Sequence, residues 1–107
     1  MSNDAHRLDD AAVRAGLAAL PAWSLEAAAP VGTLVRSARF AGWLETIAFV
    51  NALAWVCHRE DHHPDLAVGF DRATVRFTTH SAGGLTERDL RLARLVDELL
   101  AGSSAAG

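Results

Sequence analysis

The chain has 107 residues, 50% of them hydrophobic and 21% charged, a composition typical of one globular domain and not of a disordered chain. Its net charge of −3 and its lack of a long basic stretch argue against nucleic-acid binding through phosphate neutralisation. No apolar run reaches the ~18 residues of a membrane span, and the N-terminus lacks a signal-peptide core, so we expect a cytoplasmic protein with no membrane partner. We expect a single domain over residues 1–107, with 1–7 and 102–107 loosely held.

The first half of the chain predicts a helix followed by a β-hairpin. The helix is expected to begin at Asp9 or Asp10, because Asp is a common N-cap residue, and to end at Pro21. Its apolar side is formed by residues at helical spacing, namely Val13, Leu17 and Leu20. Apolar and polar residues alternate over 23–26 and 33–40, as in strands, and the Pro- and Gly-containing stretch 27–32 predicts the turn between them.

The second half begins with the longest apolar segment, residues 42–58. Apolar residues recur every three or four positions and surround this segment, so we expect a buried helix packed on a sheet. The single cysteine, Cys57, lies in this run, so we expect a buried thiol and no disulfide within the chain. Residues 65–69 and 73–78 predict two further strands, and a Gly-rich break follows at 81–84.

The last predicted element is a helix that begins at Thr86, with Asp89 three residues on as in a capping box. Its apolar face is formed by Leu92, Leu95, Val96 and Leu99. Two hairpins separated by a helix favour an α+β two-layer sandwich, in which three helices cover one face of a four-stranded antiparallel sheet. The uncovered face is expected to be solvated or to pack against another subunit.

Histidines are concentrated near the middle of the chain. Four of the five fall within 23 residues, at His58, His62, His63 and His80. One interpretation is a metal site, because His58 and His62 are four residues apart and His63 or His80 could supply a third ligand. Against it, Pro64 breaks the backbone where a rigid pair of ligands would be needed, and no second pair has a typical metal-site spacing.

A second interpretation is acid–base catalysis without a metal. His62 and His63 follow a predicted helix and His80 follows a predicted strand, so the three rings would line one pocket if these ends meet. One ring would act as base, while another, held protonated by a carboxylate such as Asp61 or Asp89, would act as acid. This arrangement suits elimination of water from a carbon. A third interpretation is a loop of solvated histidines without a chemical function.

The spacing of these residues resembles the signature of the pterin-4a-carbinolamine dehydratases, also known as dimerisation cofactors of a homeodomain transcription factor. The pattern is His58-x3-His62-His63-Pro64-x5-Phe70-x9-His80-x8-Asp89. Similar stretches lie outside it, at 5–8, 20–23 and 84–89, and the resemblance covers roughly residues 5–100. His58, Leu66, Phe70 and Asp71 differ from the residues most common in the family, and none of these positions is one of the family's catalytic histidines.

The resemblance implies a fold of the class expected above and the dehydration of a 4a-hydroxytetrahydropterin to the quinonoid dihydropterin, with no metal and no redox cofactor. It implies that His62 and His80 form the main acid–base pair, that His63 binds or assists, and that Asp89 supports the site. The implied pterin-binding residues are Asp61, Thr78, Thr79, Ser81 and Trp23, although Trp23 is equally well explained as a core residue. A homodimer or homotetramer and a functional link to an aromatic amino-acid hydroxylase are also implied. Some proteins of this fold resemble assembly factors or coactivators, so a non-catalytic protein-binding module is the alternative.

Overall fold

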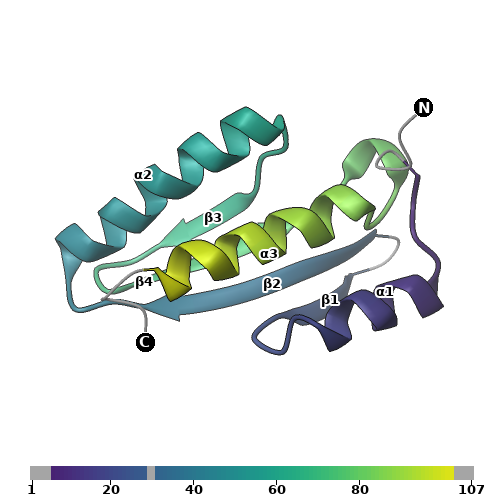
Figure 1. Cartoon of the computed structure of the whole chain (residues 1–107), viewed down its shortest axis with the longest axis horizontal. Coiled ribbons are helices and arrows are strands. Elements are labelled where there is room, and N and C mark those ends of the chain that lie inside the picture. Colours follow the sequence, from purple (N-terminus) through teal and green to yellow (C-terminus); the bar gives the residue numbers. More distant parts are fainter. Residues whose placement is uncertain (1–5, 29–30, 103–107) are drawn as a thin grey trace.

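The computed structural model of the chain describes residues 6–28 and 31–102. Its elements, in chain order, are α1 (Asp10–Ala18), β1 (Ser24–Ala28), β2 (Val31–Arg39), α2 (Trp43–Glu60), β3 (Asp65–Val68), β4 (Arg72–Phe77), the 3-10 helix η2 (His80–Ala82) and α3 (Glu87–Ala101). The strands form one antiparallel sheet in the order β1-β2-β4-β3. The three α-helices lie on the same face of this sheet, with α3 between α1 and α2 (Figure 1). The predicted α+β two-layer sandwich is therefore confirmed.

The two faces of the sheet differ as the alternation of side chains requires. In β4, Ala73, Val75 and Phe77 are buried under the helices. The opposite, uncovered face carries polar contacts between strands: the Ser37 and Thr74 hydroxyls are 2.8 Å apart, and Arg76 donates to Glu26 at 3.4 Å. The uncovered face is therefore built for contact with water rather than for an apolar core.

The hairpin between β1 and β2 differs from its prediction. The strands extend to Ala28 and resume at Val31, and Gly32 pairs with Ala27 in the ladder, so most of the stretch 27–32 belongs to strands and not to a turn. A glycine often marks a turn, but Gly32 has a strand conformation here, and a Cβ at this position would make only ordinary contact with Leu25, at 3.4 Å.

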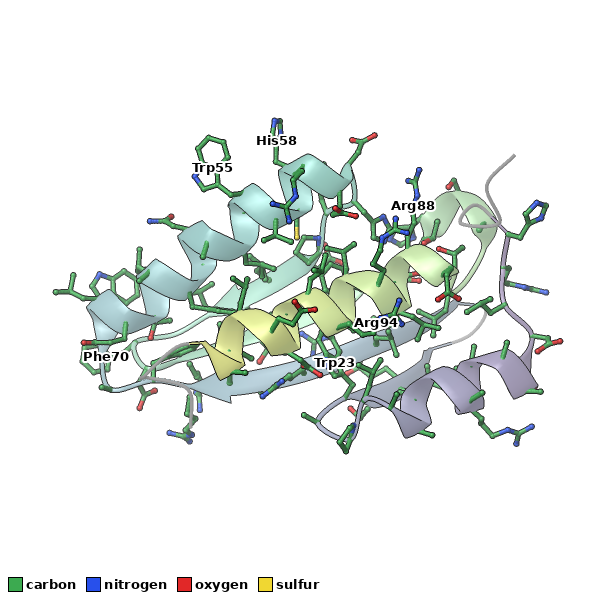
Figure 2. All side chains as sticks on the ribbon, viewed as in Figure 1. Trp23, Trp55, His58, Phe70, Arg88 and Arg94 are labelled. Carbon is green, nitrogen blue, oxygen red and sulfur yellow. The ribbon has the colours of Figure 1, made fainter. Side chains whose placement is uncertain are left out.

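The prediction that α2 is buried is wrong for one side of the helix. Its inner side is buried at Thr46, Phe49, Leu53 and Cys57. Its outer face, defined here as Leu44, Ala48, Asn51, Trp55 and His58, is exposed, with Leu44 at 78% and Trp55 at 75%. Figure 2 shows Trp55 and His58 pointing away from the rest of the molecule. Because α2 lies at the edge of the helical layer, α3 and the sheet cover only its inner side (Figure 1).

Both predicted helix starts are confirmed. The Asp9 side chain accepts a hydrogen bond from the Ala12 backbone N–H at 2.8 Å, and Thr86 and Asp89 form a capping box at the start of α3. Cys57 is free and 1% exposed, as expected. Over residues 6–28 and 31–102, no helix combines the length and hydrophobicity needed to cross a bilayer.

Candidate active site

Three chain segments meet at the end of the helical layer where α2 stops. Asp61 ends α2 in the left-handed region, with φ of 53°, and turns the chain away from the helix axis. The backbone N–H of His62 then donates to the Cys57 carbonyl at 3.1 Å. These contacts fold His62 back towards the sheet, where its ring stacks on Phe77 with 6.1 Å between centroids and 16° between planes. His62 is 9% exposed as a result.

Asp89, in the first turn of α3, holds the other side of the His62 ring. Its carboxylate is fully buried, and its Oδ1 lies 2.6 Å from His62 Nε2. Its Oδ2 accepts from the Thr79 hydroxyl at 2.7 Å and from the Thr86 backbone N–H at 2.8 Å. The two donors on Oδ2 and the N-terminal end of α3 are both arrangements that stabilise a negative charge.

Thr79 joins this cluster to the segment that carries His80. It pairs with Gly84 as an isolated bridge, and its carbonyl accepts from Ala82 N–H at 3.0 Å. These bonds close the η2 turn, which ends with Gly83 at a φ of 73°. The Asp89 carboxylate thus holds His62 and Thr79 together. These two residues directly precede His63 and His80 in the sequence.

The exposed residues of the candidate set are His63, His80, Asp61 and Ser81. Within the described residues, the imidazole rings of His63 and His80 make no hydrogen bond or ion pair, so both rings are free to meet a ligand. Thr78 lies at the end of β4 and donates its hydroxyl to the Gly32 carbonyl at 2.8 Å. The Thr78 and Thr79 hydroxyls therefore both have partners inside the protein.

Trp23 lies in the core, 6% exposed, with its ring 6.0 Å from that of Phe77 (Figure 2). Its indole N–H donates to Asp97 at 2.8 Å, and Asp97 also pairs with Arg36. The structure gives this tryptophan a role in fixing α3 on the sheet. Contact of its ring with a pterin stays a prediction.

The two histidines of the metal interpretation are directed apart. His58 lies on the outer face of α2 with its ring edge-on to Trp55, whereas His62 turns inward after the reversal at Asp61. Among residues 6–28 and 31–102, no three His, Cys, Asp or Glu side chains converge as metal ligands would. Cys57 is a poor ligand as well, because burial, and secondarily the Glu60 carboxylate, raises the pKa of its thiol to about 11.

Two residues of the cluster were missed as site residues in the sequence. Phe77 supports the His62 ring, and the Thr86 hydroxyl lies 3.0 Å from that of Thr79. A signal was present, because Thr79, two residues after β4, keeps the phase of the buried positions 73, 75 and 77, which predicts an inward side chain. A buried Thr79 hydroxyl needs a hydrogen-bond partner, and the predicted capping box of Thr86 and Asp89 could supply one.

Three comparisons with known proteins bear on this site. The family model described as pterin 4 alpha carbinolamine dehydratase matches residues 6–99. A protein of Xanthomonas oryzae pv. oryzae, provisionally named a pterin-4-alpha-carbinolamine dehydratase, is 48% identical over 97 residues, covering 87% of this chain and 80% of that protein. A protein of Stenotrophomonas maltophilia with the same provisional name is 51% identical over 84 residues, covering 78% and 71%.

Two solved structures resemble the fold. One is described as a transcriptional coactivator/pterin dehydratase from Brucella melitensis, with a TM-score of 0.81 and 28% identity, covering 88% of this chain and 98% of that one. The other is described as a pterin dehydratase-like protein that is a RuBisCO assembly factor in the alpha-carboxysome, with a TM-score of 0.63 and 27% identity, covering 78% and 93%.

Proposed function

Because the chain belongs to the pterin-4-alpha-carbinolamine dehydratase family, we propose that it dehydrates a 4a-hydroxytetrahydropterin to the quinonoid dihydropterin. The observation that carries the proposal is the His62–Asp89 pair, a nearly buried imidazole 2.6 Å from a fully buried carboxylate, with His63 and His80 beside it in the chain. A purely structural loop of histidines has no need of such a carboxylate.

The proposed reaction is an elimination in which two protons move. One imidazole removes the proton from N5 of the pterin, and another protonates the hydroxyl on C4a, which leaves as water while the C4a–N5 double bond forms. We assign the first step to His62, because the Asp89 carboxylate stabilises the positive charge that the ring gains as it accepts a proton. We assign the second step to the exposed His80, with His63 binding or assisting.

The pterin is proposed to lie over the segment from Thr78 to Ser81, beside Asp61. Asp61 and Ser81 are exposed and can offer side chains to the flat, polar ring. The hydroxyls of Thr78 and Thr79 and the indole N–H of Trp23 already have partners in the protein. These three residues would therefore meet the substrate through backbone groups or through the face of the indole ring.

The proposed reaction changes no oxidation state, so it needs no redox cofactor, and the histidines would supply both proton transfers without a metal. In a cytoplasmic setting it would supply one step in regenerating the pterin cofactor of an aromatic amino-acid hydroxylase, with a separate reduction to follow. The test is the rate of dehydration of a chemically generated 4a-hydroxytetrahydropterin, followed by absorbance with and without the protein, before and after a chelator. Acceleration that survives the chelator supports the metal-free reaction, and acceleration that the chelator abolishes contradicts it.

Substitution of single histidines tests the assignment of roles. We expect His62→Ala and His80→Ala each to lower kcat by ~10²-fold or more, as for loss of a general base or acid. His6→Ala, at an exposed histidine outside the cluster, is the matched control and should keep full activity. Full activity in both His62→Ala and His80→Ala would remove the acid–base mechanism.

A homo-oligomer is proposed through the outer face of α2. Leu44, Trp55 and the other residues of this face follow a four–three spacing, as in helix pairs that bury a seam, whereas the uncovered sheet face carries ion pairs. Trp55→Glu should lower the mass measured by sedimentation, and Arg39→Glu on the sheet face should not. The opposite pattern would move the interface to the sheet.

The second candidate function is a protein-binding module without catalysis. The exposed apolar side chains of α2 favour it, and one structural neighbour is described as an assembly factor. A folded protein that does not accelerate dehydration would support this alternative over the enzyme. Protein partners would then be sought with Trp55→Glu as the control that removes the apolar surface.

A further inference from the structure

The hydrogen bonds around Asp89 have one consistent set of directions. A carboxylate can only accept, so the Thr79 hydroxyl donates its single hydrogen to Oδ2. The contact of 3.0 Å between the hydroxyls of Thr79 and Thr86 must then run the other way, with Thr86 donating to Thr79. Asp89 is the final acceptor of this row of hydrogen bonds, and it therefore sets the direction of each of them.

These directions also decide what faces His62. Oδ2 accepts from the Thr86 backbone N–H, which can only donate, and from the Thr79 hydroxyl, so Oδ1 is the carboxylate oxygen left for the ring. With Asp89 ionised, Oδ1 accepts from His62, and the hydrogen between them belongs to Nε2. The neutral His62 ring is therefore the Nε2–H tautomer, and Nδ1 carries the free lone pair.

His62 Nδ1 is also not fully enclosed by the protein. In the part of the chain that the structure describes, Arg36 Nε is the one buried side-chain nitrogen or oxygen without a hydrogen-bond partner. His62 Nδ1 has no partner either, so it cannot be buried. The stack on Phe77 and the backbone bond to Cys57 hold the ring in this orientation.

We propose that Thr79 and Thr86 are positioning residues which, through Asp89, lock His62 in the Nε2–H tautomer, so that Nδ1 is the atom that exchanges a proton with the substrate. The assignment of Nδ1 to proton transfer rests on the proposed dehydratase function, whereas the tautomer and its control by Thr79 do not. Thr79 acts here through Asp89 and does not need to touch the pterin with its side chain.

The test is nitrogen-15 NMR of the histidine rings in the protein without substrate. In the wild type, we expect the neutral His62 ring to show a protonated Nε2 and an unprotonated Nδ1. In Asp89→Asn, the amide oxygen is needed by the Thr79 and Thr86 donors, so the amide NH₂ turns to His62 Nε2 and the ring becomes the Nδ1–H tautomer. An Nδ1–H wild-type ring, or one unchanged in Asp89→Asn, overturns the proposal.

The role of Thr79 is tested by removing only its hydroxyl. Thr79→Val is expected to leave a mixture of His62 tautomers and to lower kcat by about tenfold with little change in KM, since one bond to a charged group is lost. Thr79→Ser should restore both the Nε2–H tautomer of His62 and the wild-type kcat. Thr74→Val, in β4 and bonded to Ser37 on the uncovered face, is the matched control and should alter neither.

The outcomes separate this proposal from the proposed function. The expected tautomers without any acceleration of dehydration would contradict the dehydratase and leave Thr79 as a positioning residue of His62. Dehydration with a wild-type tautomer other than Nε2–H would keep the dehydratase and overturn the role of Nδ1. Should Thr79→Val fail to fold, the wild-type His62 tautomer and the tautomer in Thr79→Ser still test the proposal. A Thr79→Ser protein that does not keep the wild-type tautomer would contradict the control of His62 by the Thr79 hydroxyl.

Discussion

Alkaline pH provides a stability test in which one side chain dominates. All ten basic residues are Arg and the chain has no Tyr, so Cys57 is the one side chain with an ordinary pKa between about 7.5 and 12. Burial, and secondarily the Glu60 carboxylate, raises the pKa of the Cys57 thiol from 9.0 to about 11 in the folded protein. The unfolded chain therefore releases the thiol proton first as the pH rises.

The sign and size of the effect follow from linkage. The contribution of the neutral thiol is intact below about pH 9 and is lost as the pH rises towards 11, because the unfolded state then binds fewer protons than the folded state. At about 1.4 kcal/mol for each pKa unit, the free energy of unfolding falls by about 1 kcal/mol by pH 10 and by about 3 kcal/mol above pH 11.

The assay is urea unfolding followed by tryptophan fluorescence at pH 7.5, 9 and 10. Cys57→Ala has no thiol to ionise and should lose about 1 kcal/mol less than the wild type between pH 7.5 and 10, although a small cavity lowers its stability at neutral pH. Parallel pH curves for the two proteins would refute the reasoning. Rapid labelling of the native thiol at neutral pH would refute it as well, since a buried neutral thiol is unreactive.

Three further predictions concern packing, charge and binding. Asp97→Ala should lower stability in urea by ~2–3 kcal/mol, because it leaves the Arg36 charge and the Trp23 N–H without their acceptor. Replacing Arg36 and Asp97 together by Leu should recover the part that comes from the Arg36 charge, while the Trp23 N–H still lacks its acceptor. Gly16→Ala should lower Tm although Ala favours helices, because its Cβ would lie 2.6 Å from Leu90 Cδ1, and a raised Tm would contradict this close contact. His63→Ala should raise KM with little change in kcat in steady-state assays, and an equal fall in kcat and kcat/KM would instead assign His63 to the transition state.

The fold could be predicted from the sequence wherever a local signal agreed with the packing. Asp9, Thr86 and Asp89 marked helix starts, and alternation marked the strands, because caps and side-chain period depend on a few neighbouring residues. The exposure of Leu44 and Trp55 could not be predicted in this way. Apolar periodicity shows that a surface is apolar, but which neighbours cover it depends on where α2 lies in the layer.

The same limit applies to the site. The spacing of His62, His80 and Asp89 pointed to a cluster, and the structure brings His62 and Asp89 into direct contact and attaches His80 through Thr79. The different surroundings of the histidines had no sequence signal. His58 and His62 are four residues apart, yet the left-handed turn at Asp61 exposes one and buries the other.

Asp89 links the start of α3 to the orientation of His62, because one carboxylate serves both. Its Oδ2 completes the capping box with Thr86, and its Oδ1 accepts from His62. Asp89→Ala would remove the cap and the ring partner together, so a loss of activity in that variant could arise from a frayed helix. Asp89→Asn keeps an acceptor for the Thr86 N–H and changes only what faces Nε2, so stability should fall by about 1 kcal/mol while activity falls by ~10²-fold or more. A variant that loses stability and activity in proportion would show that the carboxylate holds the helix and does not orient the ring.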